Sequence, residues 1–509
     1  MKTNFSRRDF LKISSLLPVS ILAPELAKNL GIRAPQTKKN VIIIVFDAWS
    51  AYNVSLYGYA RDTTPIINKL AEKAVVYHNH YAASNYTTSG TASLLTGTLP
   101  WTHRALRPNT TVSKEYMDKS IFSVFNDYHR ISYSHNEWVN TLFDGFRSNI
   151  DEWIPRLDLY LFSSYKLIQN ILKNDGDISS VAWNRYINIE RNNYAYSLFL
   201  SQLISYFEEK SAEKYYQQFP RGLPNSETDN GFLLEHAVDW IVNRLGDITK
   251  PVFGYFHFLP PHDPYRAPIE FSGRFYKDAY ENIVKPPDIF MEPGGDFGIR
   301  NQRANYDEFI LYVDREFGRL YSELESSGIL EDTWIVLTSD HGEGFERGYI
   351  GHQVNAIYEP LIRVPLMIFE PGRNNRLDVY EKTSAIDLLP TLAHVTDKQV
   401  PVWSEGEVLP PYRPQPNLPE RGVCAIRSYE TKKDSPIKAA SVGFVKGRYK
   451  LHYYFGYSNL KSPNLIKLFD IESDPEELLN IVDREPEIAR QMTAEVEQLI
   501  KQANKPYLS

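Results

Sequence analysis

The stretch from Thr333 to Glu343 reads TWIVLTSDHGE. Its first six residues are mostly apolar and β-prone, which predicts a buried strand that ends just before Asp340 and His341. An earlier run, VIIIVF at Val41 to Phe46, has the same character and leads directly into Asp47. Such runs are typical of parallel strands buried on both faces, and ligands bind at the carboxyl ends of such strands. Asp47 and the Asp340-His341 pair are therefore predicted to form two halves of one metal site.

Composition bounds the class of protein. A chain of 509 residues with 42% hydrophobic and 23% charged residues has room for a large α/β core and a second unit. The formal net charge of −7 gives no reason to expect nucleic acid or an anionic membrane surface as partner. The 34 tyrosines suit polar, stacking surfaces such as carbohydrate or headgroup clefts, and the single cysteine, Cys424, excludes an internal disulfide framework.

The N-terminus has the pattern of a targeting signal. SRRDFLK at Ser6 to Lys12 resembles the twin-arginine export signal, and a moderately apolar stretch over 13–22 follows it. Residues 1–34 are therefore predicted to be a twin-arginine-type signal segment read by the export machinery. The expected location is periplasmic or extracellular, with a membrane tether if the signal stays uncleaved.

Strand and helix patterns alternate along the next 360 residues. Besides the two strands above, we expect strands at 75–77, 252–257 and 364–368, and helices at 66–75, 90–95, 306–327 and 385–395. This alternation predicts a catalytic domain over 39–400, with a large, mostly parallel sheet and helices on both faces. Residues 104–245 are Tyr- and Asn-rich without clear strand alternation, and we expect a helical insertion there.

The last part of the chain has a different pattern. The Pro-rich residues 401–419 look like a linker. Beyond them, 440–445 and 449–454 alternate like hairpin strands, 467–470 is a candidate third strand, and 485–503 predicts an amphipathic helix. We expect a small C-terminal subdomain over 420–509, with an antiparallel sheet and a closing helix.

A cluster of hydroxyls precedes the helix expected near residue 90. The segment from Asn85 to Gly97 reads NYTTSGTASLLTG. Free N–H groups and the helix dipole at such a point favour an anionic tetrahedral group, and a threonine there can be a nucleophile if a metal lowers its pKa. The alternative is a helix-capping cluster without chemistry.

Taken together, these segments resemble the sulfatase family of the alkaline-phosphatase superfamily over nearly all of residues 39–503. The matching pieces are Asp47 after its strand, 57–59 with 64–65, 92–97, 257–265, 339–343, 351–352, 358–365, 387–391 and 468–480. One departure concerns the nucleophile. Sulfatases that use formylglycine carry Cys or Ser, any residue, Pro, any residue and Arg where this chain has Thr87 to Thr91. Threonine cannot become formylglycine, so the pattern is closer to superfamily transferases and phosphodiesterases with an unmodified threonine.

The resemblance implies roles for particular residues. It makes Thr87 the nucleophile, with Thr88 as fallback, and Asp47, Asp340, His341 and Thr87 the metal ligands. His262 and His352 match positions that contact the transferred group or the leaving group, and His257 is a weaker candidate. We expect structural roles for the other residues. Asp263, Glu343 and Glu346 are interpreted as supporting or surface carboxylates, and Arg363 and Asp387 as part of the scaffold. No motif supports His78, His80 or His103.

Two further departures bear on the metal. Ala48 stands where many sulfatases have another acid, and His341 where calcium sulfatases often have Asn. An imidazole ligand favours Zn²⁺ or Mn²⁺ for the one divalent ion expected, with Ca²⁺ or Mg²⁺ as alternatives.

The expected function is an exported, metal-dependent hydrolase of sulfate or phosphate esters that acts through a covalent Thr intermediate. Its substrate would be a small-molecule, glycan or lipid-headgroup ester. Two alternatives stay open: a phosphoethanolamine- or phosphoglycerol-type headgroup transferase, and a catalytically silent relative that binds glycans.

Overall fold

The computed structural model describes residues 38–163, 203, 206–207, 210–226, 230–248, 251–291, 298–415 and 420–508. The predicted signal segment, residues 1–34, lies outside the described residues. Among the described residues, no helix combines the length and the apolar character that a membrane span needs.

The centre of the molecule is an eight-stranded sheet in the order β12-β2-β11-β8-β1-β7-β3-β4. Its strands are β1 (Asn40–Phe46), β2 (Val75–Tyr81), β3 (His129–Ser134), β4 (Glu152–Trp153), β7 (Val252–Phe258), β8 (Thr333–Thr338), β11 (Leu366–Phe369) and β12 (Leu377–Ser384). Neighbours pair in parallel, except that β11 runs antiparallel to both β2 and β8. The predicted α/β fold with a large, mostly parallel sheet is confirmed.

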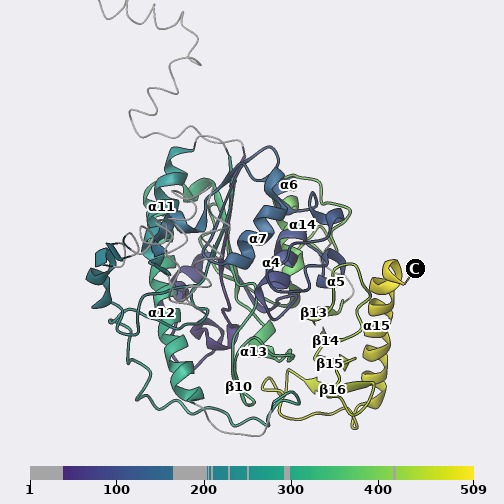
Figure 1. Cartoon of the computed structure of the whole chain (residues 1–509). Helices are drawn as coiled ribbons and strands as arrows, with labels where there is room; N and C mark the ends of the chain where they lie inside the picture. Colours follow the sequence, from purple (N-terminus) through teal and green to yellow (C-terminus); the bar gives the residue numbers. More distant parts are fainter. Residues whose placement is uncertain are drawn as a thin grey trace, which may run out of the picture.

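The sheet is buried on both faces because its central strands are apolar on both sides. In β1, Ile42, Ile44 and Phe46 pack into one core, whereas Val41, Ile43 and Val45 pack into the other. The first core is covered by α11 (Leu234–Asp247) and α12 (Ile299–Ser326). The second is covered by α4 (Thr87–Thr96), α6 (Ile121–Val124), α7 (Glu137–Gly145) and α14 (Leu388–Val395), as Figure 1 shows.

A second, four-stranded antiparallel sheet lies beside this domain, in the order β13-β14-β15-β16 (Figure 1). Its strands are β13 (Val423–Arg427), β14 (Ala440–Lys446), β15 (Tyr449–Phe455) and β16 (Asn464–Asp470), and α15 (Pro486–Asn504) packs on it. The predicted C-terminal antiparallel sheet with a closing helix is therefore confirmed.

The C-terminal sheet holds the segment that leads into α4. Ile426 N donates to Ala83 O at 2.8 Å, and Ser84 Oγ donates to Ile426 O at 2.7 Å. A buried cluster adds to the joint, because Lys450 Nζ lies 2.9 Å from Glu359 Oε1 and 2.9 Å from Glu477 Oε1. The small sheet thus fixes the backbone just before Thr87.

Two sequence predictions need correction. Residues 104–245 are not simply a helical insertion, because β3 lies between β7 and β4 in the central sheet. The strand was missed because only Ile131 and Tyr133 are large and apolar, whereas Ser132 and Ser134 are small, polar and still buried. The described part of the Pro-rich segment is not a free linker either, since Glu405 N donates to Gly97 O at 2.9 Å and Leu409 is buried.

Smaller differences concern the ends of elements. The helix expected at 66–75 ends earlier, as α3 (Pro65–Leu70) followed by a 3₁₀ turn, Ala71–Lys73, and the helix expected at 306–327 begins at Ile299. The short connecting elements are η1 (Ala51–Asn53), η2 (Ser55–Tyr57), α5 (Pro100–His103), β5 (Tyr160–Ser163), β6 (Asn230–Phe232), β9 (Gly344–Glu346), β10 (Tyr349–Gly351), α13 (Glu359–Ile362) and η8 (Ala385–Asp387).

Candidate active site

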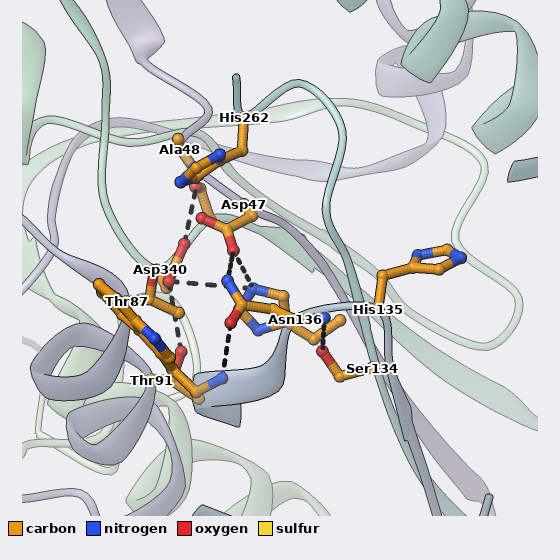
Figure 2. Close-up of polar contacts among 12 residues, drawn as sticks. Asp47, Ala48, Thr87, Thr91, Ser134, His135, Asn136, His262 and Asp340 are labelled. Atoms are coloured by element: carbon orange, nitrogen blue, oxygen red, sulfur yellow. Dashed lines mark hydrogen bonds and ion pairs between the residues drawn. The ribbon is translucent and has the colours of Figure 1, made fainter. Parts of the chain in front are cut away.

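The carboxyl ends of β1 and β8 bring together the residues that the sequence predicted as metal ligands. Asp47 follows β1, Asp340 and His341 follow β8, and ligand atoms of all three lie within 4.8 Å of one another. His341 Nε2 is 3.4 Å from Asp47 Oδ1 and 3.7 Å from Asp340 Oδ2. All three side chains are buried. Figure 2 shows the two carboxylates facing one another next to Thr87.

Thr87 joins this group from α4. Its Oγ1 lies 3.3 Å from His341 Nε2, at the first residue of the helix. Thr88 faces elsewhere, because its Oγ1 accepts a hydrogen bond from Asn109 N at 3.2 Å. The structure therefore places Thr87, and not the fallback Thr88, against the predicted ligands.

The backbone allows this close approach at two points. Ala48 takes a left-handed conformation with φ of 58°, and its N–H donates to Asp340 Oδ1 at 3.4 Å. Gly90 in α4 faces the end of β8, where a Cβ on it would lie 2.2 Å from Asp340 O. Thr91, one turn into the helix, donates to Asp340 Oδ2 at 3.3 Å. Helix α4 is thus seated directly on the metal-ligand segment.

His352 lies beside His341, and His262 lies beside His352. The ring centroids of His352 and His341 are 4.3 Å apart, and those of His352 and His262 are 4.9 Å apart. His352 Nδ1 is 2.9 Å from Glu343 Oε1, whereas its buried Nε2 meets no hydrogen-bond partner in the described part of the chain. Glu343, predicted as a supporting carboxylate, therefore orients His352.

Asp47 has two further neighbours at strand ends. His257 Nε2 lies 3.3 Å from Asp47 Oδ2 and 3.9 Å from Asp340 Oδ2, so this weaker candidate belongs to the site. Asn136, which the sequence analysis missed, donates from Nδ2 to Asp47 Oδ2 at 2.6 Å (Figure 2). A signal was present: Asn136 follows the end of β3, but β3 itself was not recognised as a strand.

Asp47 and Asp340 are two buried carboxylates whose pKa values depend on each other and on the neighbouring histidines. Burial raises the pKa of Asp340, and the charge of Asp47 raises it further. Burial lowers the pKa of His341, but the charges of Asp340 and Asp47 overcome this and raise it to about 9. Asp47 keeps a pKa well below its usual range, because His262, His257 and His341 outweigh the effect of burial.

His262 and His352 differ in charge preference. Burial lowers the pKa of His262, but Asp47, Asp263 and Glu343 together raise it above its usual value. Burial and the charges of His341 and His262 hold the pKa of His352 well below its usual value. His262 in its protonated form suits a proton donor, and the neighbouring His352 is held neutral.

The remaining candidates lie in the scaffold. Arg363 donates to His78 O, Asp387 caps η8 and binds Arg421, and Glu346 pairs with Lys285. Away from the ligand set, His78 pairs with Asp378, His80 faces Thr383 and His103 faces Ser93. The carboxylate of Asp263 lies 3.1 Å from His262 Nδ1, so Asp263 supports that ring.

Comparison with protein families decides the class. The Sulfatase family model matches residues 39–398, and the model of the N-sulphoglucosamine sulphohydrolase C-terminal region matches residues 346–504. The chain belongs to the sulfatase family. This sulfatase-family protein is therefore an ester hydrolase by family, as the sequence predicted. The two models meet in the segment that carries His352.

Individual relatives of this sulfatase-family chain are distant. The multifunctional alkaline phosphatase superfamily protein PehA of Trinickia caryophylli is 23% identical over 431 residues, which cover 74% of this chain and 77% of the relative. The choline-sulfatase of Rhizobium meliloti is 31% identical over 251 residues, covering 44% and 45% of the two chains.

Among solved structures, the phosphonate monoester hydrolase of Agrobacterium radiobacter aligns with a TM-score of 0.67. It is 18% identical, and the alignment covers 92% of this chain and 96% of the hydrolase. At that identity the likeness shows the fold alone. The roles of Thr87 and of the histidines stay predictions that rest on the geometry above.

Proposed function

We propose that this protein hydrolyses sulfate or phosphate esters by passing the sulfuryl or phosphoryl group through Thr87, with a divalent metal ion at Asp47, Asp340 and His341. The observation that carries this proposal is the position of the Thr87 hydroxyl, 3.3 Å from His341 Nε2 at the first residue of α4. A helix-capping cluster without chemistry would not require two buried carboxylates and an imidazole around it.

The donor set fits a metal ion. Asp47 Oδ1 is buried and finds no hydrogen bond in the described residues, although His341 Nε2 is 3.4 Å away. His341 Nδ1 lies 2.9 Å from Gly342 O, an arrangement that puts the proton on Nδ1 and leaves the lone pair of Nε2 free for a ligand bond. Mixed imidazole and carboxylate donors favour Zn²⁺ or Mn²⁺. When bound, such an ion would lower the pKa of the Thr87 hydroxyl and stabilise negative charge on the transferred group.

The chain's own residues supply the remaining steps. Thr87 Oγ1, having lost its proton to solvent, attacks the phosphorus or sulfur atom, and the bond to the leaving alcohol breaks. The N–H groups at the start of α4 face the negative charge of the transferred group. His262 gives its proton to the leaving oxygen, and the ring of His352, 4.9 Å from that of His262, borders the same place. Water then attacks the Thr87 ester, returns a proton to His262 and releases sulfate or phosphate.

For the location, we propose export to the periplasm or the extracellular space. The Arg7-Arg8 pair and the apolar stretch behind it support export by the twin-arginine route. Cell fractionation of the full chain and of a variant with Arg7→Lys and Arg8→Lys tests this: the variant should accumulate in the cytoplasm, and equal export of both chains would refute the route.

The chemistry is tested with two adjacent threonines. The purified protein would be assayed on 4-nitrophenyl sulfate, 4-nitrophenyl phosphate, bis(4-nitrophenyl) phosphate and a phenylphosphonate monoester, with Mn²⁺ or Zn²⁺ added. Thr87→Ala should lose at least about 10³-fold in kcat, because nucleophile and metal ligand disappear together. Thr88→Ala is the matched control, since the partner of its hydroxyl within the described residues is the Asn109 N–H; it should keep turnover within about tenfold of the wild type.

Intact mass measurement of rapidly quenched protein should show an added phosphoryl or sulfuryl group on Thr87. Turnover that survives in Thr87→Ala and disappears in Thr88→Ala would overturn the assignment of the nucleophile. Which ester in the panel is turned over fastest identifies the bond that the site prefers.

A further inference from the structure

A second cavity lies beside the candidate active site, where the C-terminal sheet meets the catalytic domain. It has a volume of about 350 Å³, and its walls include Phe290, Gln353, Arg427, Tyr429, Glu430 and Tyr457. Gln353 also lines a larger cavity of ≈ 560 Å³ that His352 borders. The two cavities therefore share Gln353 as a wall, and Gln353 directly follows the predicted catalytic residue His352.

Arg427, the last residue of β13, is the unusual group in this cavity. It is 5% exposed, and no carboxylate among the described residues lies within ion-pair distance of it. Its Nε donates to Asn355 Oδ1 at 2.9 Å and its Nη1 to Asn85 Oδ1 at 3.3 Å, whereas Nη2 has no hydrogen bond to a described residue. Buried charges are usually paired, as Arg61 is with Asp307 at 2.7 Å.

The same side chain is tied to the nucleophile segment. Asn85, two residues before Thr87, accepts from Arg427 and donates to Val354 O at 2.9 Å and to Ala356 O at 2.8 Å. One asparagine thus connects Arg427, the loop behind His352 and the start of α4.

The other walls suit a sugar ring. The guanidinium of Arg427 lies 5.0 Å from the ring centroid of Tyr429, and the Phe290 and Tyr457 rings are 5.0 Å apart. Aromatic faces pack against the C–H groups of a sugar, while Gln353 and Glu430 offer hydrogen-bonding groups to its hydroxyls. A guanidinium in a partly dry cavity binds a carboxylate, sulfate or phosphate with two parallel hydrogen bonds.

We propose that this cavity binds the leaving group of the substrate, and that this leaving group is an acidic sugar whose anionic substituent pairs with Arg427. The proposal rests on the proposed ester hydrolysis at Thr87 and names the substrate class of that site.

Calorimetric titration of the full-length protein tests it with two probes that differ by one carboxylate, glucuronate and glucose. The wild type should bind glucuronate at least tenfold more tightly than glucose. Arg427→Gln should lose this preference, and Arg427→Lys should keep part of it, because lysine retains the charge without the planar fork. Arg448→Gln is the matched control: it removes a positive charge from an exposed pair with Asp470 on the same sheet, and its preference should equal that of the wild type.

Equal affinity of the wild type for both probes, or no binding of either, would overturn the proposal, as would an unchanged preference in Arg427→Gln. If Arg427→Gln does not fold, the wild-type comparison still decides, together with Tyr429→Ala, which removes an aromatic wall and should weaken glucuronate binding at least fivefold. Binding needs no turnover, so the test is independent of catalysis. A glucuronate preference in a protein that cleaves none of the four esters would refute the proposed hydrolysis and leave the acidic-sugar cavity standing.

Discussion

At the scale of single residues, Asp47 shows how a ligand is held in place. Its Oδ2 receives the Asn136 amide at 2.6 Å and faces His257 Nε2 at 3.3 Å. The amide of Asn136 is itself fixed, because its Oδ1 accepts the N–H of Trp138 at the start of α7. Asn136 is therefore a positioning residue that acts through Asp47.

Asn136→Ser tests this role. Serine keeps the cap of α7 but is too short to reach Asp47, so the carboxylate should lose its orientation. We expect affinity for Zn²⁺ or Mn²⁺, measured by calorimetric titration, to fall about 10–100-fold with little change in melting temperature. Asn149→Ser, at an exposed site away from the ligands, is the control. Unchanged metal affinity in Asn136→Ser would show that Asp47 does not depend on this contact.

At the scale of elements, the close packing of α4 against the end of β8 sets the positions of Thr87 and Thr91. Gly90 leaves no room for a methyl group, since a Cβ would meet the Asp340 carbonyl, and this backbone oxygen cannot rotate away. The close contact sets Thr87 and Thr91 against the ligand segment at the same time.

Gly90→Ala should consequently push α4 away from β8. We expect a loss of about 1–3 kcal/mol in the free energy of unfolding and a larger relative loss of esterase activity. Gly246→Ala in α11 is the matched control, because nothing lies within 4 Å of its Cβ. That variant should gain up to about 1 kcal/mol, since alanine favours a helix. Denaturant unfolding and activity measured together check both; an active, stable Gly90→Ala would refute the close seat.

At the scale of the whole molecule, several histidines are buried in neutral form. Burial lowers the pKa of His80, His103 and His135 to about 3 in each case. Burial likewise lowers the pKa of His452, in β15, to about 4 despite the nearby Glu477. The folded protein therefore resists protonation at sites that the unfolded chain protonates near pH 6.5.

The sign of the pH effect follows. Because these folded pKa values lie below the unfolded value, the stabilisation is full above pH 6.5 and is lost as pH falls toward 4. Each such histidine steepens the loss by up to ~1.4 kcal/mol per pH unit. Melting temperatures should stay nearly level from pH 7.5 to 6.5 and fall from pH 6.5 to 5.

His135→Phe should make the fall shallower, because both ring nitrogens of His135 lack partners in the described residues and the ring stacks on Phe232. A melting temperature that stays constant down to pH 5 would contradict the prediction.

Much of this architecture could be read from local pattern. Apolar runs gave β1, β7 and β8, and alternation gave β14 and β15, because burial on one or both faces leaves a direct mark on composition. Strands of mixed polar and apolar composition were not predicted. β12, LDVYEKTS, lies at the edge of the sheet with charged residues on its open side, and β3 hides small serines under helices.

The family, the mostly parallel fold and the candidate ligand set Asp47, Asp340 and His341 could be predicted from the sequence, because an apolar strand and the polar residue that follows it are adjacent along the chain. Three features come from the tertiary structure alone: Thr87 rather than Thr88 lies beside His341, Asn136 reaches Asp47, and Arg427 borders a cavity with no carboxylate of the described residues within ion-pair distance. These outcomes depend on which way a side chain turns and on partners dozens to hundreds of residues away, and local pattern carries no record of such distances.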